Sequence, residues 1–300
     1  MNSDRREWGG IQDNVRGGVR GDVREVVSEG AFPGQDVPVL KVEGETIPEV
    51  WENAVLQCWE KGVGVRTEYD KKGDPPSKDC SMVMVVRNPL GEPRIHRAFP
   101  GGLEDLEVYR LEVVDGIHDH WIKPEEGKWS YTYHERLFAY KSGAERINQI
   151  DYAVEKLAEA PYSRRAQAIT WNVGTDRLVS DPPCLQRLWF RLTEAGDGFV
   201  LNANAHWRSR DAYKAAFMNL FALTDLMRAV GARLSERVAK PVALGRYAEF
   251  VDSFHIYGSY FAEFEGFLKT VRTRTFEARV WNSDFAEPFF EDARKKVRGC

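Results

Sequence analysis

The sequence has no apolar run that approaches the roughly 20 residues needed for a membrane-spanning helix. Its first ten residues (MNSDRREWGG) are charged and lack the apolar core of a signal peptide. The four cysteines are too few and too scattered for a disulfide framework or a Cys-x-x-Cys metal site. We therefore expect a soluble, reduced, cytoplasmic protein with no membrane partner and no bound metal.

A basic surplus is also missing. Lysine and arginine total 42 residues, aspartate and glutamate total 46, and the formal net charge is −4 at pH 7. A protein that mainly binds nucleic acid carries a basic surplus, so this balance argues against DNA as a partner. It leaves room for a small anion held by a few arginines. The 300 residues, 43% of them hydrophobic, suffice for a buried core.

The chain shows no internal repeat and no Gly/Ser-rich linker. Residues 1–35 carry several glycines among mixed charges without sustained hydrophobic periodicity, and we interpret them as a loosely ordered N-terminal arm. Residues 36–300 mix strand-like and helix-like patterns. We therefore predict that they form a single domain of the α+β class.

Hydrophobic periodicity predicts the helices and strands of this domain. Thr46 and Glu49 have the spacing of a capping box at the start of a helix that ends at Gly62. An amphipathic helix is expected over residues 145–159, and a long helix over residues 211–234 is apolar enough to lie in the core. Strands are predicted over residues 80–87, 167–172, 188–192, 199–206 and 249–258.

Four polar clusters are candidates for chemistry, and the first is Pro182-Pro183-Cys184 before a predicted strand. Cys184 is either a nucleophile or a small core residue, since free cysteine is among the most buried residue types. The second cluster, Arg208-Ser209-Arg210-Asp211, lies where a strand meets a helix. It is either an anion site made by helix N–H groups and arginines or a solvated cap with Asp211 as N-cap.

The third cluster is Ser163-Arg164-Arg165, whose basic pair is either surface charge or part of an anion site. The fourth is His255-Ile256-Tyr257 on a predicted strand. The two-residue period of a strand puts His255 and Tyr257 on one face. These two side chains are either ligand contacts or a half-buried polar pair.

Taken in order, these clusters resemble the thymidylate synthase family. The similarity extends over roughly two thirds of the chain and keeps the family's interval of eleven residues between the first arginine of its R-S-x-D motif and an asparagine. The resembling segments are Arg66-Thr67, Tyr133, Ser163-Arg164-Arg165, Thr170-Trp171-Asn172-Val173, Pro182-Pro183-Cys184, Arg208-Ser209-Arg210-Asp211, Asn219 and His255-x-Tyr257.

The resemblance implies a thymidylate synthase-like sandwich: a mixed β-sheet with flanking helices and a long buried helix, in a homodimer with shared active sites. It implies a methyltransferase that carries a one-carbon unit from 5,10-methylenetetrahydrofolate to C5 of a pyrimidine nucleoside monophosphate, with dUMP to dTMP preferred. Cys184 would add to C6 of the pyrimidine. Because a free thiol has a pKa of about 8.5, a cation such as Arg208 beside it would favour the thiolate.

The resemblance also assigns the nucleotide contacts. Asn219 would read the base, since its amide donates to O4 of uracil and accepts from N3–H, and cytosine presents the opposite pattern. Ser209 and Asp211 would contact the base and organise water near the folate, and His255 and Tyr257 would hold the sugar 3′-hydroxyl. The phosphate would be bound by Arg66 and Arg208 of one subunit and by Arg164 and Arg165 of the neighbouring subunit.

The residues that the resemblance would place around the folate depart from the family pattern. Leu185 replaces the histidine that follows the nucleophile, and Trp207 replaces the glutamine before the R-S-x-D motif. The family segment Ile-Trp-Asp-Glu-Trp resembles residues 117–121, which puts His118 in place of the first tryptophan and keeps Trp121 as a folate contact. The family's short apolar C-terminus is absent.

The remaining catalytic residues are expected upstream. Tyr133 is one, and the catalytic glutamate is Glu104, Glu107 or Glu112, of which we favour Glu107. The altered folate wall leaves an alternative open, a nucleotide hydroxymethylase that admits water and forms 5-hydroxymethyl-dUMP/UMP or 5-hydroxymethyl-(d)CMP. A relative that only binds nucleotide or RNA is a third possibility, against which Cys184 and Asn219 both argue.

Overall fold

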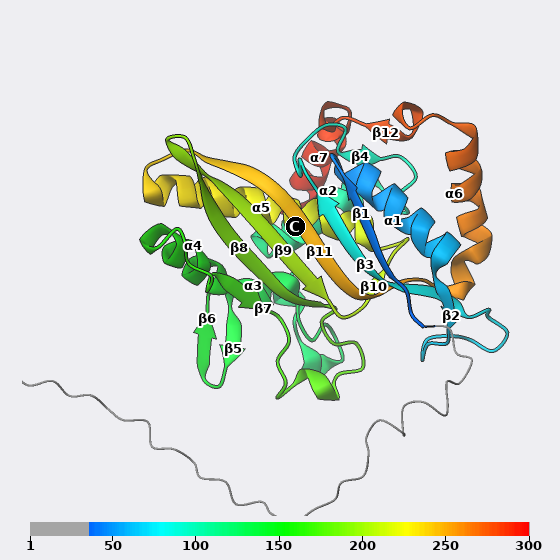
Figure 1. Cartoon of the computed structure of the whole chain (residues 1–300). Coiled ribbons are helices and arrows are strands. Elements are labelled where there is room, and N and C mark those ends of the chain that lie inside the picture. The colour runs from blue at the N-terminus through cyan, green and yellow to red at the C-terminus, as the bar shows by residue number, and fades with distance from the viewer. Residues whose placement is uncertain (1–35, 300) are drawn as a thin grey trace, which may run out of the picture. The chain divides into compact units, whose positions relative to one another are not determined.

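A mixed eight-stranded β-sheet organises the protein (Figure 1). The computed structural model describes residues 36–299, so the arm predicted over residues 1–35 lies outside the described residues. The main strand order is β1-β3-β11-β9-β8-β7, with β2 paired to β3 and β10 paired to β11. The strands are β1 (Val39–Gly44), β2 (Val63–Val65), β3 (Ser77–Val86), β7 (Gln167–Ile169), β8 (Leu185–Ala195), β9 (Gly198–Trp207), β10 (Arg210–Asp211) and β11 (Val242–Ile256).

Strand direction follows from the connections. The β8–β9 pair is an antiparallel hairpin, whereas β11 lies parallel to β9 and antiparallel to β3. Parallel neighbours need a crossover, and the long helix α5 (Ala216–Val238) supplies it between β9 and β11. Helix α5 runs behind these strands in Figure 1. The predicted α+β class with a mixed sheet, flanking helices and a long buried helix is confirmed.

Helices pack against the sheet and against one another. Helix α1 packs on β1, β3 and β11, while α5 packs on β11 and α2. Trp51 of α1 lies at the centre of the core, where its ring meets Phe217 and Phe267 edge-on and its indole N–H donates to the Ala212 carbonyl oxygen at 2.9 Å. The other helices are α1 (Ile47–Lys61), α2 (Leu103–Asp115), α3 (Tyr133–Phe138), α4 (Gln149–Glu159), α6 (Phe261–Thr273) and α7 (Ser283–Arg298).

Short elements complete the fold. Strands β4 (Ile95–His96) and β12 (Val280–Trp281) pair with each other, as do β5 (Tyr140–Ser142) and β6 (Glu145–Ile147). The 3₁₀ turns are η1 (Asp119–Trp121), η2 (Pro124–Glu126), η3 (Asp176–Leu178), η4 (Gly258–Tyr260) and η5 (Glu277–Arg279). Among residues 36–299, no helix is both long and apolar enough to cross a bilayer.

Two predicted helix starts and one predicted capping box are wrong for local reasons. The helix expected from residue 145 begins at Gln149, because residues 145–147 pair with β5 and the Asn148 side chain caps the helix through the Asp151 N–H at 2.9 Å. The predicted capping box is incomplete. Thr46 is the N-cap but makes no side-chain cap bond, while Glu49 accepts from the Glu45 N–H at 2.7 Å.

The long helix begins five residues later than predicted. Arg210 and Asp211 pair with β11 as the short strand β10. The Asp211 carboxylate then accepts the N–H groups of Tyr213 and Lys214 at 3.0 and 2.8 Å, which forms a turn before Ala216. Asp211 is therefore a turn residue and not the N-cap of α5.

Candidate active site

Cys184 lies directly before β8, in a loop that Arg208 holds in place. The Arg208 backbone N–H donates to the Cys184 carbonyl oxygen at 2.9 Å. Its guanidinium donates to the carbonyl oxygens of Pro182 and Pro183 at 2.6 and 3.0 Å. Burial raises the pKa of the half-buried Cys184 thiol, and the charge of Arg208 opposes that rise. One arginine thus fixes the loop and favours the thiolate.

A cavity of about 620 Å³ opens beside this thiol. Its volume lies within the usual range of small-molecule sites, about 300–1,000 Å³. Six of the predicted site residues line it: Arg66, Cys184, Arg208, Ser209, His255 and Tyr257. The other lining residues are Val65, Thr67, Glu68, Tyr69, Asp79, Ser180, Asp181 and Ser253.

Arg66 lies in the loop between β2 and β3, and its side chain is 62% exposed. Its guanidinium donates to the Asp74 carbonyl oxygen at 2.6 Å and lies 3.7 Å from the Asp70 carboxylate. Asp70 in turn accepts from the backbone N–H of Thr67 at 3.0 Å. The loop is thereby folded so that a cation faces the cavity from an exposed position.

His255 and Tyr257 meet at the inner end of the cavity, with ring centroids 4.5 Å apart. His255 is 4% exposed, and burial lowers the pKa of its imidazole, which favours the neutral ring. Its Nδ1 lies 3.2 Å from the Ser253 hydroxyl, which donates to Asp79 at 2.6 Å. Nε2 has no hydrogen-bond partner among the described residues, so it remains available to a ligand.

Asp79 and Ser253 are site residues that the sequence did not reveal. The antiparallel pairing of β11 with β3 sets Asp79 opposite His255, and such a register is not readable from one sequence. Ser253, by contrast, could have been found from the sequence. It lies two residues before His255, the spacing that places two side chains on one face of a strand.

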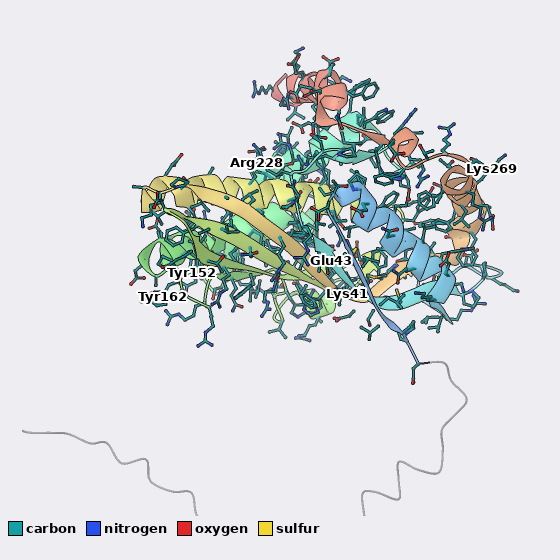
Figure 2. All side chains as sticks on the ribbon, turned by 45° about the horizontal axis from the view of Figure 1, so that its top comes forward. Lys41, Glu43, Tyr152, Tyr162, Arg228 and Lys269 are labelled. Carbon is teal, nitrogen blue, oxygen red and sulfur yellow. The ribbon has the colours of Figure 1, made fainter. Side chains whose placement is uncertain are left out.

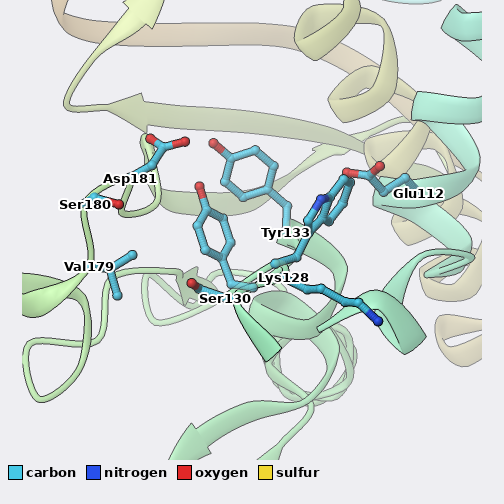
Figure 3. Close-up of a pocket in the computed structure, with 10 residues that line it drawn as sticks. Glu112, Lys128, Ser130, Tyr133, Val179, Ser180 and Asp181 are labelled. Carbon is cyan, nitrogen blue, oxygen red and sulfur yellow. The ribbon is translucent and has the colours of Figure 1, made fainter. Parts of the chain in front are cut away.

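A second cavity, of about 470 Å³, adjoins the first, and Ser180 and Asp181 line both (Figure 3). Its other lining residues are Glu112, Gly127, Lys128, Trp129, Ser130, Tyr131, Tyr133 and Val179. The rings of Trp129, Tyr131 and Tyr133 therefore line a cavity that shares two wall residues with the cavity beside Cys184. A flat aromatic ligand suits such walls.

Tyr133 connects this second cavity to the nucleophile loop. Its hydroxyl oxygen accepts the Leu185 N–H at 3.3 Å, one residue after Cys184. Its ring stands edge-on to Trp207 with centroids 5.9 Å apart. Burial raises the pKa of Tyr133, so the hydroxyl stays protonated at neutral pH and can donate to a ligand.

Glu112 and His118 form a polar pair at the second cavity. The Glu112 carboxylate lies 2.8 Å from His118 Nδ1, and burial raises the pKa of the carboxyl. The His118 imidazole stacks on Trp121 with ring centroids 3.6 Å apart. Trp121 itself lines an adjoining groove of about 390 Å³ together with Trp129, which also lines the second cavity.

Glu107 and the pair Arg164–Arg165 lie elsewhere in the chain. Glu107 is buried between Arg110 and Arg294, with oxygen–nitrogen distances of 2.7 and 2.9 Å, and lines a different, smaller pocket of about 160 Å³. Arg164 and Arg165 are exposed and line a surface pocket with Tyr152. Figure 2 shows Tyr152 at one end of the molecule, near Tyr162.

Asp211 and Asn219, two predicted site residues, follow β9 in the chain, and Arg210 lies beside Asp211. Burial raises the pKa of Asp211 to about 6. Arg210 is buried and paired with Glu249, which also accepts from the Trp207 indole N–H at 3.2 Å. Asn219, in the first turns of α5, donates through Nδ2 to the Tyr109 hydroxyl at 2.6 Å.

Comparison with known proteins agrees with this arrangement. The family model described as "Thymidylate synthase" matches residues 104–284. The chain is 30% identical over 227 residues to a Methanocaldococcus jannaschii protein named "Putative thymidylate synthase", covering 73% of this chain and 91% of that protein. A Methanopyrus kandleri protein of the same name is 30% identical over 220 residues, covering 73% and 93%.

The fold is also found in a solved structure, thermostable thymidylate synthase A from Bacillus subtilis, with a TM-score of 0.54 and 18% identity over 73% of this chain and 83% of that one. The sheet, the crossover helix and the paired cavities at Cys184 define a small-molecule enzyme. The chain belongs to the thymidylate synthase family. Members of this family use a nucleotide substrate and a folate-derived one-carbon donor.

Proposed function

We propose that the protein transfers a one-carbon unit from 5,10-methylenetetrahydrofolate to C5 of dUMP and forms dTMP. The observation that carries this proposal is the junction of two cavities at the nucleophile loop. Cys184 and Arg208 line the cationic cavity, aromatic rings line the other, and Ser180 and Asp181 line both. This junction suits a reaction that brings a nucleotide and a flat donor together at one carbon.

The nucleotide fits the first cavity by charge and hydrogen bonding. Arg66 and Arg208 are the cations for the phosphate, and the fork of a guanidinium matches its oxygens. His255 Nε2 and the Tyr257 hydroxyl are available to the sugar 3′-hydroxyl. We assign the uracil edge to Asn219 and a further base contact to Ser209, so we expect dUMP to bind more tightly than dCMP.

We further infer a homodimer in which Arg164 and Arg165 complete the phosphate site of the neighbouring subunit. Within one chain they line a surface pocket apart from Cys184. Exposed apolar side chains surround them, as expected of a surface that binds a partner: Ile147, Tyr152, Tyr162 and Ile169. Sedimentation should give twice the chain mass, and Arg164→Ala should weaken dUMP binding without dissociating the dimer.

The second cavity has the walls that a folate-derived donor needs. Tyr131, Tyr133 and Trp129 offer ring faces, and Trp121 with His118 extends the aromatic lining along the adjoining groove. When bound, this donor supplies the carbon and, for a methyl product, the hydride. Asp211, a half-buried turn residue two positions after Ser209, would organise water between the two ligands.

The chain's own residues then carry out the covalent steps. The Cys184 thiolate donates an electron pair to C6, and the C5–C6 π electrons move toward O4, where an Asn219 N–H stabilises the charge. C5 becomes nucleophilic and takes up the carbon. A base then removes the C5 proton, and the electron pair left at C5 would break the bond between the transferred carbon and the donor nitrogen, so that the donor leaves as an amine. Hydride from the donor, for a methyl product, or hydroxide from water, for a hydroxymethyl product, would add to that carbon, and the S–C6 bond breaks to return its electron pair to sulfur.

We propose Glu112, rather than Glu107, for the glutamate that moves protons with Tyr133. Glu112 lines the cavity, and burial raises the pKa of its carboxyl, which favours proton uptake relative to a solvated carboxylate. Glu107 instead neutralises Arg110 and Arg294 away from both cavities. Glu112→Gln should abolish turnover while dUMP still binds, and Glu107→Gln should retain turnover. The reverse result would return the role to Glu107.

A specific observation keeps a second product in consideration. The Glu112–His118 pair puts a potential base at the donor cavity, where it can activate water for a hydroxymethyl product. The buried apolar residues Leu185 and Trp207 beside the nucleophile favour the methyl product, since they exclude water. Incubation with methylenetetrahydrofolate and dUMP, UMP, dCMP and CMP, followed by mass analysis, distinguishes the two products.

The covalent step has a direct test. With 5-fluoro-dUMP and methylenetetrahydrofolate, the protein should gain the mass of both ligands at Cys184. Cys184→Ala should bind dUMP but form no adduct and no product. Turnover by Cys184→Ala would refute the proposed chemistry. We also propose that residues 36–300 are the catalytic domain, so a chain starting at residue 36 should keep turnover.

A further inference from the structure

Asn219 is held by a partner that the catalytic scheme does not use. Its Nδ2 donates one N–H to the hydroxyl oxygen of Tyr109, on α2, at 2.6 Å. An amide carries two N–H donors and one acceptor oxygen. Among the described residues, neither the second N–H nor Oδ1 of Asn219 has a hydrogen-bond partner. One N–H donor and the acceptor Oδ1 of this amide therefore remain unpaired. Asn219 is 7% exposed and is not among the residues that line the two cavities of the candidate site.

The polarity of this contact follows from the charges around Tyr109. Burial raises the pKa of the hydroxyl, so it carries its proton and can either donate or accept. Among the nearby charged groups, the carboxylate of Glu112 raises that pKa and the guanidinium of Arg210 lowers it. The O–H is attracted toward the carboxylate, which leaves an oxygen lone pair for Asn219 Nδ2. Rotating the amide by 180° would require the hydroxyl to turn against this field.

We propose that Tyr109 is a positioning residue that fixes the orientation of the Asn219 amide and thereby sets the preference for uracil over cytosine. This inference rests on the proposed pyrimidine nucleotide site. The remaining N–H and Oδ1 match O4 and N3–H of uracil. They mismatch the amino group and N3 of cytosine, where two donors and two acceptors would face each other.

Tyr109→Phe removes the hydroxyl and keeps the ring. Without its anchor the amide can rotate and present either order, so dUMP should bind less tightly and dCMP more tightly. A neutral hydrogen bond is worth about 1 kcal/mol, so the ratio of the dUMP and dCMP affinities should fall about fivefold or more. Titration calorimetry of the full-length protein with each nucleotide measures this ratio without relying on turnover.

The matched control is Tyr140→Phe. The Tyr140 hydroxyl donates to the Trp171 carbonyl oxygen at 2.9 Å, so its hydrogen bond does not involve Asn219. This variant also loses one partly buried tyrosine hydrogen bond, but it should leave the affinity ratio unchanged. Circular dichroism of both variants reports whether each is folded.

A second pair of variants tests the same contact with reversed polarity. Asn219→Asp has only acceptor oxygens, so Tyr109 must turn and donate to the carboxylate. The aspartate would then accept from the cytosine amino group. In this background Tyr109→Phe should weaken dCMP binding, whereas in the wild type it strengthens it. That change of sign is not expected of a residue that merely fills space.

The outcomes separate the two proposals. An affinity ratio that Tyr109→Phe leaves unchanged, with both nucleotides weakened equally, would make the hydroxyl a structural contact and overturn the inference while the nucleotide site stands. If the wild type binds neither dUMP nor dCMP, the proposed function falls and the inference falls with it. A ratio that falls in Tyr109→Phe and not in Tyr140→Phe supports the inference.

Discussion

Asp211→Asn should stabilise the protein at neutral pH. The Asp211 carboxylate accepts the N–H groups of Tyr213 and Lys214, yet burial raises its pKa to about 6 from an ordinary value of 3.8. The buried charge therefore costs more than these bonds return. Asparagine keeps an acceptor oxygen for both N–H groups and can donate to the Tyr260 hydroxyl, so the substitution removes mainly the charge.

The size and the pH dependence of this stabilisation follow from the linkage between proton binding and folding. Because the folded pKa lies above the unfolded one, the native state binds a proton between about pH 4 and pH 6 that the unfolded chain releases. The native state therefore loses relative stability as pH rises through this window. A difference of about two pKa units corresponds to about 3 kcal/mol. The advantage of Asp211→Asn should be about 0.5 kcal/mol near pH 4 and about 3 kcal/mol above pH 7.

Urea unfolding followed by tryptophan fluorescence, repeated from about pH 4 to pH 8, measures this advantage. The control is Asp197→Asn, since Asp197 is exposed in the β8–β9 turn and its charge is solvated in both states. A stability difference that does not change with pH would refute the linkage argument. Asp211→Asn that is less stable than the wild type at pH 8 would show that the charge itself holds the turn.

Three further perturbations follow from the same contacts. Iodoacetamide should alkylate Cys184 faster as pH rises toward and past 9, since burial raises the thiol pKa, and Arg208→Gln should slow the reaction at pH 8 about three- to tenfold by removing the opposing charge. Glu249→Gln should lower the free energy of unfolding in urea by about 3–5 kcal/mol, because buried Arg210 loses its ionic partner. Glu107→Gln should lower the melting temperature in calorimetry while the dUMP dissociation constant stays within about twofold.

Hydrophobic periodicity was sufficient for elements whose packing face is apolar. The helix that ends before Gly62 and the core helix α5 were both found this way. It failed where a side chain or a neighbouring strand decides the backbone. Residues 145–147 look helical by pattern but pair with β5, and Asp211 looks like a helix cap but pairs with β11. Such contacts are between segments, so a single-sequence pattern does not contain them.

The residues of the cavity at Cys184 also divide into those that sequence motifs predict and those that contacts between strands decide. Arg66, Arg208 and His255 were expected from their motifs, and they line one cavity although they lie far apart in sequence. Asp79 completes the polar set around His255 and belongs to no motif in the sequence. Its place depends on the register of β3 against β11. Motif order therefore predicted six residues that line this cavity, but it also included Asn219, Asp211, Arg164 and Arg165, which do not line it, and strand register decided what surrounds His255.

The two glutamates of α2 illustrate a different limit. Glu107 and Glu112 are five residues apart, so a helical turn of about 100° per residue puts them on different faces. Which face meets the second cavity depends on α7, since Arg294 binds Glu107 and commits that face to an ion pair. Arg294 lies 187 residues further along the chain. The sequence offered both carboxylates, and the ion pairs of Glu107 with Arg110 and with Arg294 of α7 distinguish them.

Two of the residues that depart from the family pattern lie next to each other in the structure. Leu185 and Trp207, which replace a histidine and a glutamine of the family, are cross-strand partners in β8 and β9. Both are buried, and the Trp207 ring packs edge-on against Tyr133 while its N–H turns inward to Glu249. A polar pair has thus become one apolar wall beside Cys184. If the proposed one-carbon transfer takes place here, this wall excludes water on its own side, and the Glu112–His118 pair is the group to test for a hydroxymethyl product.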